Sequence, residues 1–198
     1  MTKIKYCRLS TEAEQVLQQF APHQQNLQAL RQRAGWPDVI TYTIFMLPYR
    51  QALELTLAFI SRVYEHQLKQ EPRQLLQQVK KWHLSGGDIL RHQLFEQAEI
   101  MGFDNPVSGL ALSVFLSEGS LTKADLEAVY PPSWQSLMML VSTVNLILSI
   151  SAGNPETSKE SAEQFFCLAQ DALARLSGGS DTGRKNYLYQ ESELKEIF

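Results

Sequence analysis

Two histidines and one aspartate are the residues of this sequence best suited to acid–base chemistry. His83 and Asp88 are separated by four residues, and His92 lies four positions after Asp88. A histidine can act as a general base when it lies within hydrogen-bond reach of the proton that it removes, and a neighbouring carboxylate can orient it. These three residues define one candidate site, which a hydrolase or a transferase would use.

The residues between His83 and Asp88 favour a structural interpretation of the same pattern. Glycerolipid acyltransferases share the H-x-x-x-x-D spacing, but two residues at one spacing occur by chance in many sequences. Here the spacing is filled by Leu84-Ser85-Gly86-Gly87, and glycine is the usual residue at the C-terminal end of a helix. Asp88 is then expected to cap the next helix. We therefore expect no catalytic residue and a protein that is not an enzyme.

A metal site built on the histidines is not favoured either. His66, His83 and His92 would need a carboxylate such as Glu65 or Glu96 to complete a ligand set. Zinc sites usually contain a tight local pair, such as H-x-x-x-H or C-x-x-C, and the sequence has neither. We expect solvated histidines and no metal.

Two cysteines and one glycine-rich segment are also better explained without chemistry. Cys7 and Cys167 lie far apart, so we expect buried or idle thiols in a reducing compartment, with an extracellular disulfide as the alternative. Residues 178–185 match a phosphate-binding loop only in part, because Arg184 stands where that loop has lysine and a helix is expected before it. We interpret this segment as linker and expect no cofactor.

Length, composition and charge are those of one globular domain. The chain has 198 residues, of which 44% are hydrophobic, and this is enough to form a core. The net charge of −3 argues against nucleic acid as a partner, because nucleic-acid-binding surfaces are usually basic. The N-terminal residues contain no apolar segment of the kind found in secretory signals, so we expect a cytoplasmic protein.

An uncharged helix from about residue 131 to 151 is expected at the centre of the fold. No charged residue occurs between Glu127 and Glu156, and Gln135, Ser142 and Ser149 form one narrow polar stripe. A helix that is apolar over most of its circumference is either buried or spans a membrane. Seven Ser, Thr, Asn or Gln residues from 135 to 151, and the lack of closely flanking Lys or Arg, favour the buried alternative without stable membrane insertion.

Two expectations about this helix can be checked in a structure. Its largest apolar side chains should be almost fully buried, namely Leu140, Val144, Ile147 and Leu148. Its serines Ser142 and Ser149 should face a close neighbouring helix, and the small residues Ser108, Gly109 and Ala111 form the candidate partner surface.

The rest of the sequence predicts an all-α fold, a single orthogonal or irregular bundle of eight to ten helices around the central one. Proline and glycine separate segments with helical periodicity, and no segment shows the sustained alternation of a strand. Besides the central helix, the predicted helices cover about residues 11–20, 24–34, 37–47, 49–68, 72–85, 88–101, 105–118, 122–129 and 156–177. We expect a helical domain at 1–176, a flexible linker at 177–186 and a short docking segment at 187–198.

Four short motifs in the middle of the chain resemble those of an uncharacterised family of small helical bacterial proteins. They read Leu47-Pro48-Tyr49-Arg50-Gln51-Ala52, Gly102-Phe103-Asp104-Asn105-Pro106, Phe115-Leu116-Ser117-Glu118-Gly119-Ser120-Leu121 and Pro131-Pro132. That family has a "P-x-R-x-A" helix start and an "F-x-x-G-G-S-L/I" turn ahead of a Pro-Pro pair. The resemblance covers roughly residues 36–175.

The sequence departs from the family pattern at two places. Glu118 replaces the first glycine of the turn, and Leu53 to Leu57 stand where the family has a tryptophan pair. The resemblance implies an accessory component encoded beside bacterial secretion machinery, of the type VI kind, and it brings no catalytic residues with it. The matching positions themselves are typical of helix starts and ends.

These observations predict an adaptor or chaperone-like interaction protein of a bacterial secretion-type system. Its partner would be a protein, such as a secretion-system component or effector, and a homodimer stays open. The expected partner-binding residues are the apolar side chains beyond the linker, namely Tyr187, Leu188, Tyr189, Leu194, Ile197 and Phe198. The alternatives are the enzyme with a site near His83, Asp88 and His92, and a peripheral membrane protein that uses the central helix or the C-terminal segment.

Overall fold

The computed structural model describes residues 9–18, 20–122 and 125–177, and within these residues it is all-helical. The α-helices are α1 (Thr11–Val16), α2 (His23–Arg33), α3 (Trp36–Met46), α4 (Tyr49–Val63), α5 (Gln70–Ser85), α6 (Asp88–Met101), α7 (Pro106–Phe115), α8 (Ser133–Ser151) and α9 (Pro155–Ser177). One 3₁₀ turn, η2 (Glu65–Gln67), follows α4. The all-α prediction is confirmed.

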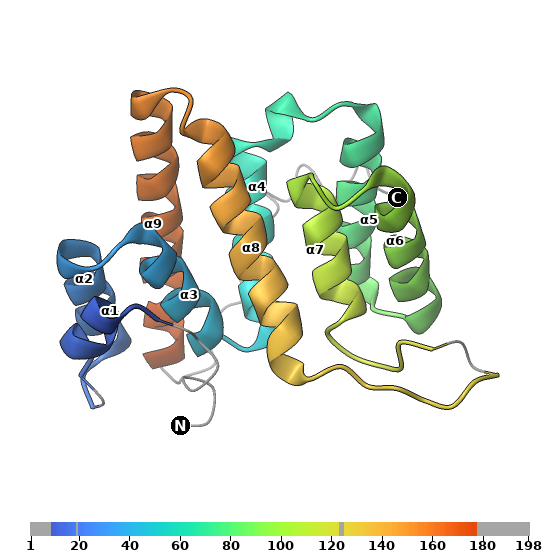
Figure 1. Cartoon of the computed structure of the whole chain (residues 1–198), viewed down its shortest axis with the longest axis horizontal. Helices are drawn as coiled ribbons and strands as arrows, with labels where there is room; N and C mark the ends of the chain where they lie inside the picture. Colours follow the sequence, from blue (N-terminus) through green and yellow to red (C-terminus); the bar gives the residue numbers. More distant parts are fainter. Residues whose placement is uncertain (1–8, 19, 123–124, 178–198) are drawn as a thin grey trace.

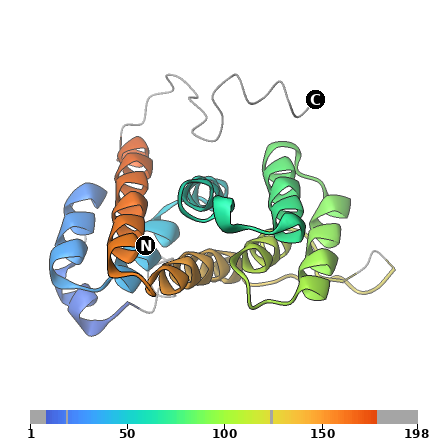
Figure 2. The same ribbon diagram turned by 90° about the horizontal axis from the view of Figure 1, so that it is seen from above.

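The helices are arranged around α8, which crosses the middle of the molecule (Figure 1). α8 packs against α7 on one side and against α3, α4 and α9 on the others, while α5 and α6 lie beyond α7. Seen from above, α7 and α8 lie along one edge of the molecule, and α4 and α5 lie behind them (Figure 2). The central helix therefore has a buried side and an open side.

The buried side of α8 carries three of the four residues that were expected there. Leu140, Val144 and Ile147 are fully buried in the core, whereas Leu148 is only half-buried. Leu148 still packs against the core from the flank of the helix. The expectation of near-complete burial is confirmed for the first three residues and wrong for Leu148.

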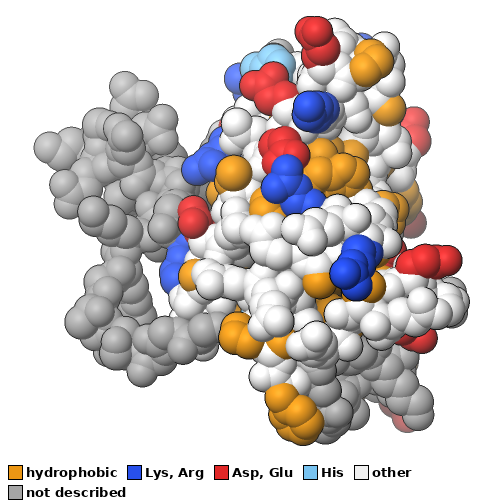
Figure 3. Space-filling model, turned by 90° about the vertical axis from the view of Figure 1, so that its left-hand side faces the viewer, with side chains coloured by type: hydrophobic (Ala, Val, Ile, Leu, Met, Phe, Trp, Pro, Cys, Tyr) orange, Lys and Arg blue, Asp and Glu red, His pale blue; other side chains and the backbone are white. Residues whose placement is uncertain are grey.

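The face formed by α1, α2 and α9 is polar and mixed in charge. Acidic and basic side chains alternate on it with small hydrophobic patches (Figure 3). Arg31 of α2 pairs with Glu163 of α9, and its guanidinium lies 4.5 Å from the centre of the Phe166 ring. This contact fastens α2 to α9 at the surface.

The small residues of α7 do contact α8, but through a different side of α8 than expected. Ser113 Oγ donates to the Ser136 carbonyl at 2.8 Å, and a Cβ atom added at Gly109 would lie 2.9 Å from Thr143 Oγ1. Ser142 and Ser149 are exposed instead. The prediction for these two serines is wrong, because successive helical residues point about 100° apart and Thr143, not Ser142, lies on the α7 side.

Replacing Gly109 with Ala is expected to destabilise the fold by about 1–2 kcal/mol. The added methyl group would overpack the contact with Thr143, and the better helix propensity of alanine offsets only part of that cost. The Thr143 hydroxyl is buried without a hydrogen-bond partner among the described residues, so Thr143→Ala removes the clashing atom without breaking a bond. In the Thr143→Ala background, Gly109→Ala should become neutral or stabilising. An equal loss of urea stability in both backgrounds would exclude this contact as the cause.

Candidate functional site

The structure brings Asp88 and His92 together but gives them a structural partner. Asp88 is the first residue of α6, and its Oδ2 lies 3.8 Å from Nε2 of His92. Asp88 was expected to cap α6; Gly87 occupies the cap position, and the Asp88 carboxylate binds Arg91 instead. His83 lies in the last turn of α5, where its Nδ1 is buried without a partner among the described residues. Asp88 therefore does not orient His83 through Nδ1.

Arg91 is the centre of this cluster, and it is fully buried. Its Nε donates to Asp88 Oδ1 at 2.8 Å, and its Nη1 donates to the Phe115 carbonyl at 2.6 Å. Its Nη2 lies 2.6 Å from the Ser120 carbonyl and 3.0 Å from His92 Nε2. In this arrangement the Nε2 lone pair of His92 accepts from the guanidinium. A general base would need that lone pair, so the geometry favours a structural role for the cluster over a catalytic one.

The turn after α7 is shaped to wrap this arginine. Gly119 has a φ of +72°, and a Cβ atom added there would lie 2.8 Å from Arg91 Nη2. The Arg91 guanidinium also lies 5.0 Å from the centre of the Phe115 ring. The phenylalanine, glycine and serine of the F-x-x-G-G-S turn are thus residues that contact Arg91, which gives that motif a physical reason.

Sequence reasoning missed Arg91, although a signal for it exists. Arg91, Leu94 and Ala98 recur at helical spacing, and all three are buried in α6. An arginine on the apolar side of a helix needs hydrogen-bond acceptors when it is buried. The acceptors come from residues 115–120, and no pattern within α6 indicates them.

The start of α4 joins the same end of the molecule. The Arg50 guanidinium lies 5.1 Å from the centre of the Trp82 ring, and its Nη1 donates to the His83 carbonyl at 3.1 Å. Its Nη2 lies 3.9 Å from Glu118, and both of these side chains are about half exposed. Tyr49 shares a hydrogen bond of 3.2 Å with Ser113 of α7. The P-x-R-x-A motif therefore ties α4 to α5 and α7.

Residues 120–130 form a loop whose base is fixed by Arg91, and we call it the anchored loop. Leu121 N–H donates to the Val129 carbonyl at 2.8 Å, and Val129 N–H donates to Ser120 Oγ at 3.1 Å. Thr122 Oγ1 donates to the Glu127 carbonyl at 2.7 Å. The helix predicted at 122–129 is wrong for the described residues of that range. Serine and threonine hydroxyls here bind backbone groups that a helix would use itself.

The anchored loop presents apolar side chains to solvent. Leu126 is 61% exposed, Val129 49% and Tyr130 69%. In Figure 1 the described parts of the loop project beyond the ends of the neighbouring helices. Large apolar side chains gathered on a protruding segment mark interaction sites more often than isolated ones do.

Lowering the pH is expected to destabilise the fold through His83. Burial lowers the pKa of its imidazole below the usual 6.5, and the positive charge of Arg50 lowers it further. The unfolded chain therefore takes up this proton first, so stability is complete above about pH 6.5 and falls as the pH drops through the folded-state pKa. The free energy of unfolding in urea, measured from pH 7.5 to 5, should fall less steeply for His83→Gln than for the wild type. His66→Gln, at an exposed histidine, is the matched control, and identical slopes in all three proteins would contradict the prediction.

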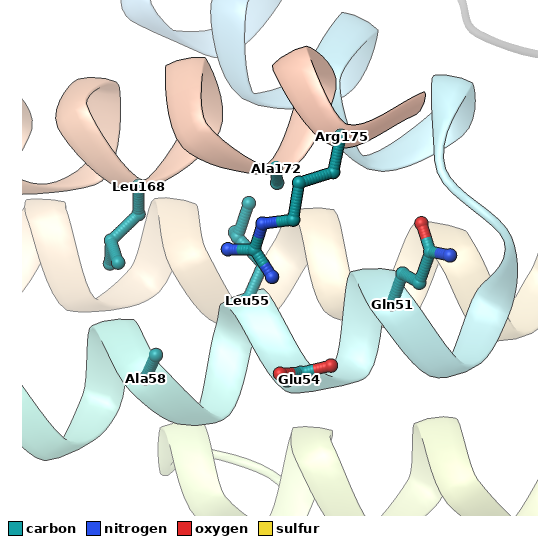
Figure 4. Close-up of a pocket in the computed structure, with 7 residues that line it drawn as sticks. All are labelled: Gln51, Glu54, Leu55, Ala58, Leu168, Ala172 and Arg175. Carbon is teal, nitrogen blue, oxygen red and sulfur yellow. The ribbon is translucent and has the colours of Figure 1, made fainter. Parts of the chain in front are cut away.

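The cavities of the described part of the chain include one between α4 and α9. Its volume is about 140 Å³, and its lining residues are Gln51, Glu54, Leu55, Ala58, Leu168, Ala172 and Arg175. Arg175 reaches from α9 toward Glu54 of α4, over the apolar floor (Figure 4). None of His83, Asp88 and His92 lines this cavity. Its room suits a single apolar side chain, because an apolar cavity of about 150 Å³ binds benzene.

The described residues contain no group of three or more His, Cys, Asp or Glu side chains that could hold a metal ion. Cys167 is a free and exposed thiol, so the expectation of burial is wrong for it, and Cys7 lies outside the described residues. The expected partner-binding residues also lie outside them, namely Tyr187, Leu188, Tyr189, Leu194, Ile197 and Phe198. Their role stays a prediction.

Comparison with known proteins identifies the chain through its helical core. No curated protein and no solved structure is significantly similar to it. The model of one family, described as a family of unknown function (DUF6931), matches residues 26–173. The matched range runs from within α2 to within α9 and includes Arg50, Arg91 and Gly119. Because it spans most of the chain, the protein belongs to this family of unknown function.

Proposed function

We propose that this protein is a non-enzymatic cytoplasmic interaction protein, an adaptor or chaperone-like accessory of a bacterial secretion-type system. Its partner is a protein, a component or an effector of that system, which buries the exposed side chains of the anchored loop. The observation that carries the proposal is the exposure of Leu126, Val129 and Tyr130 on a loop whose base is held by the buried Arg91. The link to secretion comes from the resemblance of the motifs alone.

The construction of the loop suits binding for two reasons. A segment that is already ordered loses less conformational entropy when a partner covers it, so more of the contact energy appears as affinity. Tyrosine is enriched among the residues that dominate protein–protein binding, because its ring is large and its hydroxyl can still hydrogen-bond. Tyr130 is the most exposed of the three apolar residues.

The membrane alternative has one observation behind it. α8 is long and apolar enough to cross a bilayer by length and composition, with a mean hydropathy of 1.4. The core helix of a soluble protein passes the same test. Leu140, Val144 and Ile147 of this helix are fully buried against other helices, so we favour the protein partner.

The proposal is tested by quantitative capture from the native host. The bait is the full chain, compared with a variant that combines Leu126→Ser, Val129→Ser and Tyr130→Ser. Ile89→Ser with Ile100→Ser is the matched control, because these residues are 79% and 88% exposed on α6. We expect the wild type and the control to capture a secretion-system protein that the loop variant loses.

Two outcomes would overturn the proposal. Equal capture by all three baits would show that the anchored loop is not the contact. A loop-dependent partner from outside any secretion apparatus would keep the binding role and exclude the secretion role. Circular dichroism checks that the loop variant is folded, which is expected because its three side chains are largely exposed.

A further inference from the structure

The open side of α8 carries a seam that is independent of the anchored loop. Gln135, Met139, Ser142, Leu146 and Ser149 follow one another at spacings of four, three, four and three residues. This is the spacing of the contact positions in a coiled coil, and it keeps side chains on one face of a helix. Ser142 and Ser149 are exposed, and the other three are half-buried.

The apolar residues of this seam point away from the core. Met138 and Leu148, on the flanks of α8, pack against the core although they are only partly buried. Met139 and Leu146 are partly buried to a similar degree and do not pack against it. Ile150, at the end of the same face, is 44% exposed. The seam is therefore an apolar helix face without a partner among the described residues.

α7 extends the same open surface. It packs against α5, α6 and α8, which leaves it open on the side where α8 is also open (Figures 1 and 2). Leu112 and Leu116 are the half-buried leucines at and just beyond its C-terminal turns, and neither packs against the core. We call the combined surface of Leu112, Leu116 and the α8 seam the α7–α8 face.

The α7–α8 face lies on two segments without charge. No Asp, Glu, Lys or Arg occurs in residues 105–117 or in residues 128–155. The chain as a whole carries a net charge of −3, so two copies repel each other weakly at a distance. Across this face, however, they can meet without removing an unpaired charge from water, which is the costly event at an interface.

The order of large and small residues along the seam makes it complementary to itself. In an antiparallel pair of α8 helices, Met139 lies opposite Ser149 of the second copy when Ser142 lies opposite Leu146. Each layer then joins one large apolar side chain to one serine, which lets the two helices approach closely. A two-fold interface requires this reciprocity, because residue i must meet j where j meets i. We propose that the α7–α8 face binds a second copy of this chain, with the two α8 helices antiparallel.

The size of the face sets the strength of this association. α8 has 19 residues and α7 has 10, so the helices are about 28 Å and 15 Å long, and each is about 10 Å wide. The footprint on each copy is thus about 430 Å², or about 860 Å² for the pair. Stable complexes bury about 1,200–2,000 Å², and smaller interfaces are typical of transient ones. The dimer is therefore reversible and dissociates on dilution.

Analytical ultracentrifugation of the full chain tests the proposal, from about 1 μM to about 500 μM, a range that covers weak dissociation constants. The wild type should shift from monomer to dimer across this range. Ser142→Glu places two carboxylates in the interface, and we expect it to weaken the dimer at least about 100-fold, since like charges there cost several kcal/mol. Ser142 is exposed, so the monomer should tolerate the change, whereas Ile100→Glu on α6 should dimerise like the wild type.

Cysteine cross-linking tests the orientation. With Cys7 and Cys167 replaced by Ser, a mixture of Ser142→Cys and Leu146→Cys chains should form the mixed disulfide in preference to either homodisulfide. A dominant disulfide between two Ser142→Cys chains would indicate parallel helices and overturn the antiparallel arrangement.

Three results would overturn the dimer itself. The first is a wild-type monomer at every concentration, and the second is a Ser142→Glu variant that dimerises like the wild type. The third is a monomer that sediments with phosphatidylcholine vesicles through the same face, which would assign the face to a membrane. The anchored-loop variant should dimerise normally, so failure of the dimer and failure of the proposed partner contact can be told apart.

Discussion

Replacing Arg91 with Ala is expected to lower the free energy of unfolding by about 3–5 kcal/mol, which is a large part of the stability of a typical domain. The substitution leaves the Phe115 and Ser120 carbonyls without their donor and opens a cavity in place of a fully buried side chain. Each unpaired buried acceptor costs about 1–3 kcal/mol, and the cavity adds to that cost. Urea unfolding followed by circular dichroism measures the loss.

Two companion variants assign the effect to the contacts of Arg91. Arg91→Lys keeps the charge but lacks the planar fork that reaches separate acceptors, so it should recover only part of the stability. Arg50→Ala removes a half-exposed arginine from the same end of the molecule and should cost about 1 kcal/mol or less. In Arg91→Ala, the amides of Leu121 and Val129 should also exchange their hydrogens faster, because they close the base of the anchored loop. Equal losses for Arg91→Ala and Arg50→Ala would contradict this account of the site.

Leu140→Ala is the second substitution with a large expected effect, a loss of about 2–5 kcal/mol. Leu140 is fully buried in α8, where α8 packs against α3, α4, α7 and α9, so the surrounding helices can fill the cavity only in part. Leu146→Ala is the matched control on the same helix, because Leu146 faces outward and should cost about 1 kcal/mol or less. A loss below about 1 kcal/mol for Leu140→Ala would show that α8 is peripheral rather than central.

Most of the helical framework could be predicted because its signals are local. Proline and glycine mark the turns, and the apolar spacing indicates which side of each helix is buried. Asn105, for example, precedes Pro106 in the sequence, and in the structure its side chain accepts from Ser108 N–H at the start of α7. The absence of charge from Glu127 to Glu156 likewise indicated the position of α8.

The features that the sequence did not reveal depend on contacts between distant residues. Whether Ser142 or Thr143 faces α7 is decided by where α7 packs, and the two positions differ by one residue on the same helix. The segment from Ser120 to Val129 has the composition of a short helix, but the acceptors of Arg91 and the hydroxyl of Ser120 hold it as a loop. The candidate site moved for the same reason, from the pair His83 and Asp88 to the arginine that binds Asp88.

The central claim is that the anchored loop contacts a protein partner, and site-specific photo-cross-linking in the native host tests it most directly. A photoreactive amino acid is placed at Tyr130 in one strain and at Ile100, an exposed apolar position on α6, in another. We expect a discrete cross-linked product of higher mass from position 130 that position 100 does not give, and mass spectrometry should identify in it a secretion-system protein. The absence of any product from position 130, or the same products from both positions, would contradict the claim.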